Sequence, residues 1–541
     1  MKKMKLFLCL VATILLSVSC SDNDKMQNLL ENIPESTDLV FVGNVKTVLE
    51  SAGGKIENSM IVLPDYVASE MGKGDTKEFN KTNEFFKAAG IDMEACAVMM
   101  SFRNNSPILV FALEDQQKFV DVLKQKGYQK DSDKGDAVFY MKPSESSYGS
   151  PNYVALNGSF AYVIMENYLR SDFNAISYLQ RVIEDAAEAN YADTPSGEYI
   201  LGTNGGGLAT KLPAKLKNEM REEGLLNAEA NILLNAVYCV RGELTSNKAT
   251  VECKVFPENG DEFDTEKLAK LFDIKSEVSD EALKLLGSQE NIVMAMSMKD
   301  ANWDEVSNLI ATTSHLSRSE KAQMNAVFSY LEKIDGTVAY GMGVTNGIES
   351  FIKIDKEQEV LNQFSATIVI ETKEGKAKLL IEDMKGMLEQ LRMPFNEDAT
   401  GFSINLDNMG GTVYVKQVDN FIVVANHAIN KDNDNPVVKR ADFSNCIAAI
   451  YMGLNSDDKL AKDLGVKDNI TIGICCKPKD GKAYMSLEID GSSDSGVIEK
   501  MARLLLNSQK KVEQRMREAY AQEEVVEEAA YLEPEDYDNF E

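Results

Sequence analysis

The sequence predicts an α+β fold built from two tandem, related units, each an antiparallel sheet with packed helices. Three observations lead to this prediction. The chain has 541 residues, more than one hydrophobic core usually serves. Six stretches of the first half recur in the same order in the second half. Strand-like runs follow one another across short polar turns, with long amphipathic stretches between them. A doubly wound α/β fold would need a regular alternation of strand and helix, which the sequence lacks.

The internal duplication sets the domain limits, because six matches in one order rarely arise by chance. We expect a first unit over residues 26–275 and a second over residues 281–506, joined by a short charged segment. The matching stretches are 28–45 with 284–298, 85–100 with 329–342, 106–128 with 364–387, 158–167 with 419–428, 197–216 with 445–464, and 246–256 with 480–489.

Individual elements follow from local patterns. Residues 137–141 and 420–427 alternate as strands do, whereas 173–189 and 318–333 have helical spacing. Ser317 and Glu320 form a capping box for the last of these helices. Residues 507–541 are expected to form a C-terminal helix followed by an acidic, disordered tail, since nine acids and no base lie between residues 522 and 541.

The first 25 residues are typical of an exported, lipid-modified protein. Basic residues precede an apolar run at 6–16, too short to span a membrane, and small residues follow. This arrangement resembles the bacterial lipobox. We therefore expect a signal peptide over residues 1–19, lipidation of Cys20 and an acidic tether over residues 20–25. The alternative is an ordinary cleaved signal followed by an incidental cysteine.

The residues after the cysteine suggest a destination. Ser21, Asp22, Asn23 and Asp24 resemble the acidic export signal of surface lipoproteins of Bacteroidota. This resemblance implies an outer-membrane lipoprotein displayed on the cell surface. The periplasmic face of the same membrane is the alternative, because a solvated tether would have a similar composition.

A wider resemblance involves most of the mature chain. The opening "IPESTDLVFVGNVKTVLESAG" at 33–53, the "AAGID" helix end before a strand, the lipobox and the two-unit length are similar to a family of uncharacterised Bacteroidota lipoproteins with a large domain of unknown function. The resemblance implies a cell-envelope lipoprotein. It implies no particular activity and no site residues.

Charge and cysteine content exclude some classes. The chain carries 86 acidic and 57 basic residues, a formal charge of −29, so nucleic acid is not an expected partner. Apart from Cys9 and Cys20 there are six cysteines, too few in this length for a disulfide framework. Cys239 and Cys253 could be bridged across a hairpin only if its loop has three residues. Cys475 and Cys476 should point to opposite faces of a strand.

The sequence contains few patterns that indicate catalysis or metal binding. His315 and His427 lie in no recognisable hydrolase motif, so a structural or surface role is expected for each. Asp432 and Asp434 lack the remaining ligand positions of a calcium loop, and a solvated turn is the expected structure there. No metal site and no cofactor are predicted.

Two stretches leave alternatives open. Gly205, Gly206 and Gly207 follow an apparent strand, where they could form an anion-binding loop or simply a flexible one. Met294, Met296 and Met298 share one face of a strand; thioethers can bind copper(I), but core packing is the favoured interpretation.

Together these features predict a lipid-anchored envelope protein that binds or scaffolds a protein or glycan partner without catalysis. The alternatives are a carboxylate-based glycan hydrolase, which needs two acids across a cleft, and an envelope chaperone or lipid carrier. A broad apolar patch without such acids would favour binding.

Overall fold

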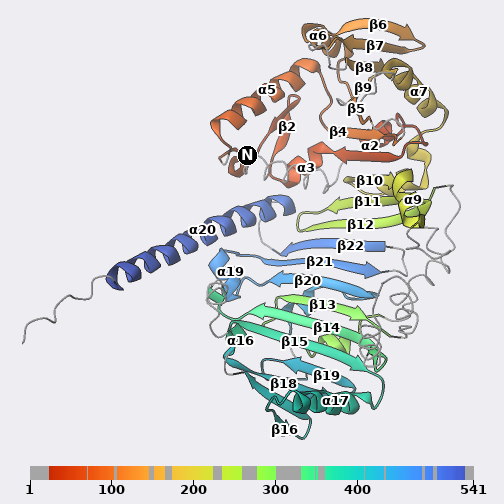
Figure 1. Ribbon diagram of the computed structural model, residues 1–541. Helices are drawn as coiled ribbons and strands as arrows, with labels where there is room; N and C mark the ends of the chain where they lie inside the picture. The colour runs from red at the N-terminus through yellow and green to blue at the C-terminus, as the bar shows by residue number, and fades with distance from the viewer. Residues whose placement is uncertain are drawn as a thin grey trace, which may run out of the picture.

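Twenty antiparallel strands form one continuous sheet in the computed structural model, which consists of two units along the sheet (Figure 1). Between residues 23 and 530 the structure describes all residues except 70, 103–105, 145–150, 165–173, 223–233, 259–276, 300–330, 348, 351–359, 407–408, 432–433, 478–481 and 491–495. The α+β class with antiparallel sheets is confirmed.

The first unit contributes ten strands. From the outer edge inward their order is β6 (Gln129–Lys134), β7 (Ala137–Lys142), β8 (Asn152–Asn157), β9 (Phe160–Ile164), β5 (Ile108–Ala112), β4 (Ala95–Met100), β1 (Leu39–Asn44), β10 (Gly206–Lys211), β11 (Ala236–Leu244) and β12 (Lys248–Pro257).

The second unit repeats this order. Its strands are β16 (Asn396–Asp398), β17 (Gly401–Leu406), β18 (Gly411–Val418), β19 (Phe421–Ala425), β15 (Phe364–Thr372), β14 (Ile334–Val344), β13 (Ile292–Ser297), β20 (Ala448–Leu454), β21 (Asn469–Lys477) and β22 (Lys482–Asp490). Each strand therefore has a counterpart at the same place in the other unit, which is the arrangement expected from a duplicated sequence.

The two units meet through equivalent strands. β12 pairs antiparallel with β22, from Lys248 opposite Glu488 to Lys254 opposite Lys482. Glu252 lies opposite Tyr484, and the registers of the neighbouring strands make these two residues counterparts of one another. The junction is therefore self-complementary, like the interface of a two-fold dimer.

Helices cover parts of both faces. Those of the first unit are α2 (Asn23–Leu30), α3 (Val45–Ser51), α4 (Asp65–Ala68), α5 (Lys73–Ala89), α6 (Gln116–Gln125), α7 (Ala175–Glu188), α8 (Pro195–Leu201) and α9 (Ala214–Glu222), with a small hairpin of β2 (Lys55–Glu57) and β3 (Met60–Val62). Those of the second are α12 (Asp280–Leu283), α16 (Val360–Gln363), α17 (Lys376–Gln390), α18 (Pro436–Arg440), α19 (Lys459–Leu464) and α20 (Val497–Ala530). Within the described residues, no helix combines the length and apolarity of a membrane span.

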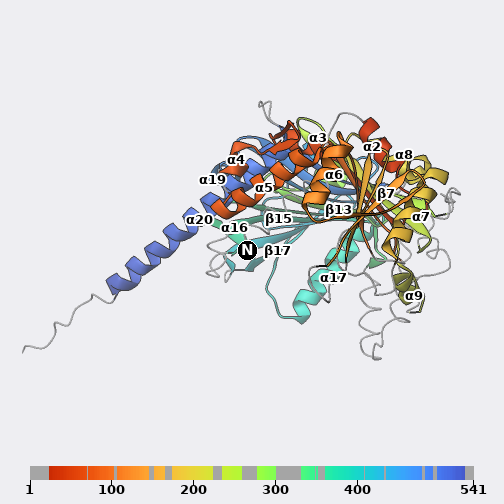
Figure 2. The same ribbon diagram turned by 90° about the horizontal axis from the view of Figure 1, so that it is seen from above.

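One face of the sheet carries the main cores of both units, and we call it the covered face. In the first unit α2, α7 and α8 pack there on residues such as Val40 and Ala97, and in the second α12 and α18 pack there on residues such as Val293 and Ala449. On the opposite face, α5 and α6 cover the outer strands of the first unit, and α17 those of the second. Figure 2 shows α2, α3 and α8 on one side of the sheet and α17 on the other.

The junction between the units has its own small core. The first turns of α20 pack with α3, α19 and the ends of β11, β21 and β22. The buried Lys500 of α20 donates to Asn247 Oδ1 at 2.7 Å, in the β11–β12 turn. Beyond these turns α20 projects away from the sheet (Figures 1 and 2). Residues 507–530 thus continue the helix that begins at Val497.

The expected secondary structure holds at several places. The strands expected at 137–141 and 420–427 correspond to β7 and β19, and the helix expected at 173–189 corresponds to α7. Most of the helix expected at 318–333, including Ser317 and Glu320, lies outside the described residues, as does the acidic tail from residue 531.

The prediction of an acidic tether over residues 20–25 is wrong for its last three residues. Asn23, Asp24 and Lys25 belong to α2, whose Met26 and Leu30 are fully buried in the first unit's core. Lys25 also forms an ion pair with Asp92. Residues 23–25 therefore belong to the folded body, because the helix that contains them supplies core residues.

Candidate functional site

The middle of the second unit presents a row of large apolar side chains to solvent. We call this surface the Met/Ile face; it consists of Met294, Met296, Ile368, Ile450, Met452 and Ile474. Met294 is 40% exposed, Ile450 48% and Ile474 54%. Their strand neighbours point the other way into the core, where Ala295 and Tyr451 are 4% exposed. The alternation that buries one face of these strands thus leaves an apolar opposite face open.

Strand register makes this surface continuous. Met294 pairs with Ile450, and Ile450 pairs with Ile474, so three strands contribute neighbours in one line. On the other side Met294 pairs with Tyr340, which pairs with Ile368. Directly paired side chains on one face lie about 4.5–5.5 Å apart. The six residues therefore lie on β21, β20, β13 and β15, and the half-buried Tyr340 of β14 lies between Met294 and Ile368.

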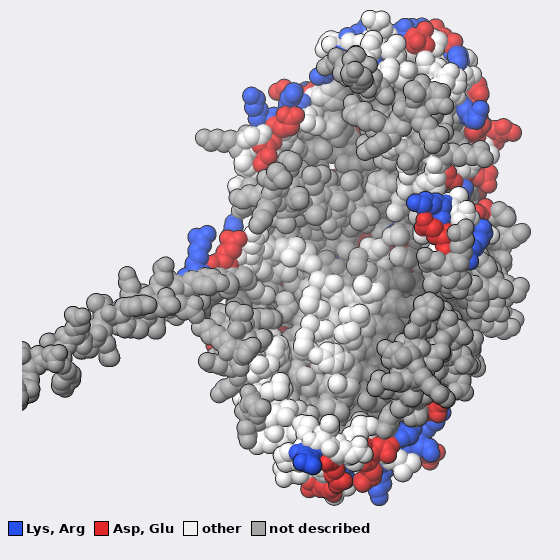
Figure 3. Space-filling view, viewed as in Figure 1, with Lys and Arg blue, Asp and Glu red and all other residues white. Residues whose placement is uncertain are grey.

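The surface is also uncharged. α17 packs on Ile370 and Val424, which are on the same side as Ile368, and α17 lies in front of the sheet in Figure 1. Figure 3 therefore views this side: the described atoms over the middle of the second unit are uncharged, and charged side chains gather at the rim. Val338, Tyr340 and Met342 of β14 are half-buried on this side, and of these only Tyr340 has a polar group.

The sequence interpretation of the methionines was wrong for two of them. Met294 and Met296 point away from the core and are 40% and 41% exposed, whereas Met298 lies just beyond β13 and is half-buried. Periodicity places these residues on one face but does not reveal which face helices cover. Within the described part of the chain, no three or more His, Cys, Asp or Glu residues are grouped so that they could hold a metal ion.

Behind this surface, the covered face holds a polar cluster centred on the fully buried Glu290. Its Oε2 accepts a hydrogen bond of 2.8 Å from the Gly287 amide, and its Oε1 accepts one of 2.5 Å from the Thr367 hydroxyl. His427 Nε2 lies 3.3 Å from the same Oε1. Gly341 is required beside it, because a Cβ there would collide with the Glu290 carboxylate.

The cluster favours a protonated imidazole. His427 Nδ1 lies 3.0 Å from the Ala428 carbonyl oxygen, to which it can only donate, and Nε2 faces the carboxylate. The hydrogen bond to Glu290 therefore raises the pKa of His427 above its ordinary value, although burial opposes this. Sequence reasoning missed this partner because Glu290 and His427 are 137 residues apart. Hydroxyl, imidazole and carboxylate do not form a nucleophile relay here, since Thr367 and Glu290 both face Nε2.

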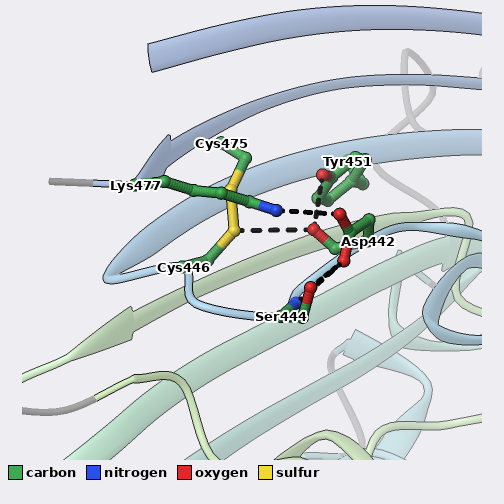
Figure 4. The surroundings of a disulfide bond; sticks show 6 residues. All are labelled: Asp442, Ser444, Cys446, Tyr451, Cys475 and Lys477. Carbon is green, nitrogen blue, oxygen red and sulfur yellow. Dashed lines mark hydrogen bonds and ion pairs between the residues drawn. A yellow bond between two sulfur atoms is a disulfide. The ribbon is translucent and has the colours of Figure 1, made fainter. Parts of the chain in front are cut away.

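A disulfide lies at one end of the second unit's core (Figure 4). It joins Cys446 to Cys475, whose Cα atoms are 6.1 Å apart, and both residues are buried. Beside it Lys477 Nζ donates to Asp442 Oδ2 at 2.8 Å, and Tyr451 donates to the Asp442 carbonyl oxygen at 3.0 Å. Burial raises the pKa of Asp442, but hydrogen bonds from Lys477 and Ser444 outweigh it and hold that pKa below its ordinary value.

The structure tests two expectations about the cysteines: a bridge between Cys239 and Cys253, and opposite faces for Cys475 and Cys476. Cys239 lies opposite Lys254 and Cys253 opposite Val240, so the hairpin register does not bring the two thiols together, and both are free. Cys475 is buried, whereas its neighbour Cys476 is half-buried, as expected for adjacent strand residues. Nothing in the local sequence pattern indicates the bridge, because Cys446 lies 29 residues before Cys475, in the segment that precedes β20.

The glycine run has a packing role that the sequence did not suggest. It follows helix α8 rather than a strand, and Gly206 and Gly207 lie within β10 rather than in a flexible loop. Gly206 has φ +99°, and a Cβ there would collide with the Val42 carbonyl oxygen; one at Gly207 would collide with that of Val240. Gly205 accepts a 3.4 Å bond from the Asn44 amide. Ligand binding by these three residues stays a prediction.

The other sequence candidates are scattered. Asp434 pairs with Lys439 at 2.5 Å, and Asn435 caps α18, so this segment includes a helix-capping turn. Cys20, Ser21, Asp22, His315 and Asp432 lie outside the described residues, whereas Asn23 and Asp24 are in α2. None of these residues belongs to the Met/Ile face.

Comparisons with known proteins add little. No family model matches the chain. No curated protein matches it either. Among solved structures, crystal form IV of TP0453 is 13% identical over 42% of this chain and 79% of that one, with a TM-score of 0.25. Crystal form III is 12% identical over 46% of this chain and 88% of that one, with a TM-score of 0.26.

Proposed function

We propose that this protein is a lipid-anchored envelope protein that binds a partner, without catalysis, through the Met/Ile face. The observation that carries the proposal is the contiguous exposure of six large apolar side chains on one side of a sheet. Single exposed apolar residues are ordinary, whereas contiguous patches mark interaction sites. Covering such a patch removes apolar surface from water, at roughly 25 cal/mol per Å².

The composition of the face favours binding over chemistry. The strand backbones beneath it are already paired on both sides, so they offer no free edge to the partner. Methionine side chains are flexible and polarizable, so they adapt to partners of different shape. The partner surface should accordingly be apolar, with polar contacts confined to the charged rim.

The location rests on separate observations. A buried disulfide is typical of proteins that fold in oxidising compartments, which supports export. The lipobox-like segment ending at Cys20, the acidic residues after it and the resemblance to Bacteroidota envelope lipoproteins add the outer membrane and its cell surface to the proposal.

Photo-cross-linking in intact cells tests the binding role. A photoreactive residue replaces Ile450 in one strain and Leu505, which is 55% exposed on α20, in the other. We expect a discrete adduct from position 450 and none of the same mass from position 505. The partner identified in this way is then purified for affinity measurements.

Charge substitution completes the test. Ile450→Glu should weaken binding of that partner at least tenfold, because it desolvates a carboxylate in an apolar contact. Leu505→Glu is the matched control and should leave the affinity unchanged. Equal adducts from both positions, or an unaffected affinity in Ile450→Glu, would show that this face is not the binding surface.

A further inference from the structure

The length of chain between Cys20 and the folded body limits how the protein can sit on a membrane. Asn23 is the first residue of α2, so only Ser21 and Asp22 separate the helix from the cysteine. Three Cα–Cα steps span about 11 Å at most. A lipid on Cys20 therefore holds the bilayer surface within that distance of the α2 N-terminus.

α2 itself cannot act as a loose extension. Met26, Leu29 and Leu30 are buried in the first unit's core, and Lys25 is paired with Asp92. Pulling the helix away from the sheet would expose these apolar side chains to water. The outward side of the helix is polar, with Asp24, Gln27 and Asn28 exposed, and Glu31, directly after the helix, is exposed too.

The anchor and the Met/Ile face are on opposite sides of the sheet. α2 packs on Val40 and Ala97, which belong to the covered face. Register pairs lead along this same face from Val40 through Ala209 and Cys239 to Lys254, and across β22 and β21 to Ala449 and Ala295 of the second unit. The Met/Ile face points the other way, and β13 lies seven strand spacings from β1, about 34 Å.

From these distances we infer that the lipid on Cys20 seats the covered side of the first unit directly on the bilayer, with the Met/Ile face turned away from it. The bilayer contact is the exposed side of α2. Its exposed residues are the acids Asp24 and Glu31 and the amides Gln27 and Asn28, with no base among them. Attachment therefore comes from the lipid and not from attraction to anionic head groups. The partner of the Met/Ile face is consequently not the membrane that carries the anchor.

Energy transfer to vesicles tests this inference, which rests on the lipid anchor of the proposed function. The full-length lipidated chain carries a fluorescent amino acid at Asn28 or at Ile474 and is reconstituted into phosphatidylcholine vesicles with an acceptor on the head groups. We expect several-fold stronger transfer from position 28 than from position 474. A twelve-residue Gly/Ser spacer between Asp22 and Asn23, with a mean span of about 20 Å, should reduce transfer from position 28.

The outcomes separate the two claims. Equal transfer from both positions, or no effect of the spacer, overturns the seating while the anchor stands. An unacylated N-terminus by mass spectrometry, or vesicle binding that Cys20→Ala does not abolish, overturns the anchor and the seating together.

Discussion

The two units share one strand order, but their centres differ in a way that separates scaffold from site. Where the second unit has Glu290, Thr367 and Gly341, the strand registers and sequence positions place Thr37, Ile108 and Met99 in the first. Ile108 and Met99 are buried in an apolar core. The fold therefore does not require a buried charge at this place, and among the described residues the polar cluster occurs in the second unit alone.

The opposite face differs at matching positions too. Phe41 and Leu208 of the first unit correspond to Met294 and Ile450 of the second. The first pair is half-buried, whereas the second pair is exposed. The two units therefore differ in the exposure of the apolar side chains at these positions, which is why we assign binding to the second unit.

The largest expected effect is removal of the buried carboxylate. Glu290→Ala leaves the Thr367 hydroxyl, the Gly287 amide and the imidazole without their acceptor, and breaking a buried pair costs about 3–5 kcal/mol. Urea denaturation measures the loss.

The matched control is the equivalent position of the first unit. The hydroxyl of Thr37 has no hydrogen-bond partner within the described part of the structure, so Thr37→Val should change the free energy of unfolding by less than about 1 kcal/mol. Similar small losses for both variants would mean that the cluster does not support the second unit.

Loss of the disulfide should have the next largest effect. Cys475→Ala breaks the bridge to Cys446, 29 residues away, and should lower the free energy of unfolding by about 2–4 kcal/mol. Cys476→Ala, next to it and unbridged, is the control. A reductant should destabilise the native protein and leave Cys475→Ala unchanged. If a reductant does not change the free energy of unfolding of the native protein, the bridge is contradicted.

The pH dependence of stability should come partly from His427. Because the pKa of His427 is raised in the folded state, its contribution is fully present below the ordinary value of 6.5. The contribution is lost as the pH rises through the raised folded-state pKa. Urea midpoints between pH 5.5 and 9 should therefore fall more steeply for the native protein than for His427→Gln. Parallel curves for the two proteins would contradict the assignment.

The smallest effect on stability is expected on the Met/Ile face itself. Ile450→Gln should change the free energy of unfolding by no more than about 0.5 kcal/mol, since the side chain is about half exposed. Ile108→Ala, in the core of the first unit, should cost about 2–5 kcal/mol. A large loss in Ile450→Gln would show that this side chain is part of a core.

Sequence reasoning could reach the duplication and the antiparallel class, because strand periodicity and repeat order are local signals. It could not say which face of β13 is open, since that depends on helices far away in the chain. The pairing of Glu290 with His427 and of Cys446 with Cys475 likewise arises only when distant strands align. Met294 and Met296 show the limit most clearly: their common face was predicted, and its exposure was not.

Methionine oxidation in place tests the binding role of the Met/Ile face most directly. Purified protein and intact cells are exposed to the same mild oxidant, and sulfoxide formation is followed at Met294, Met296 and Met452. Met409, which is 42% exposed outside this face, reports oxidant access, and the buried Met99 reports unfolding. We expect the three face methionines to react several-fold more slowly in cells while Met409 reacts equally in both. If each of the four exposed methionines is oxidised at the same rate in cells as in the purified protein, a partner on this face is contradicted.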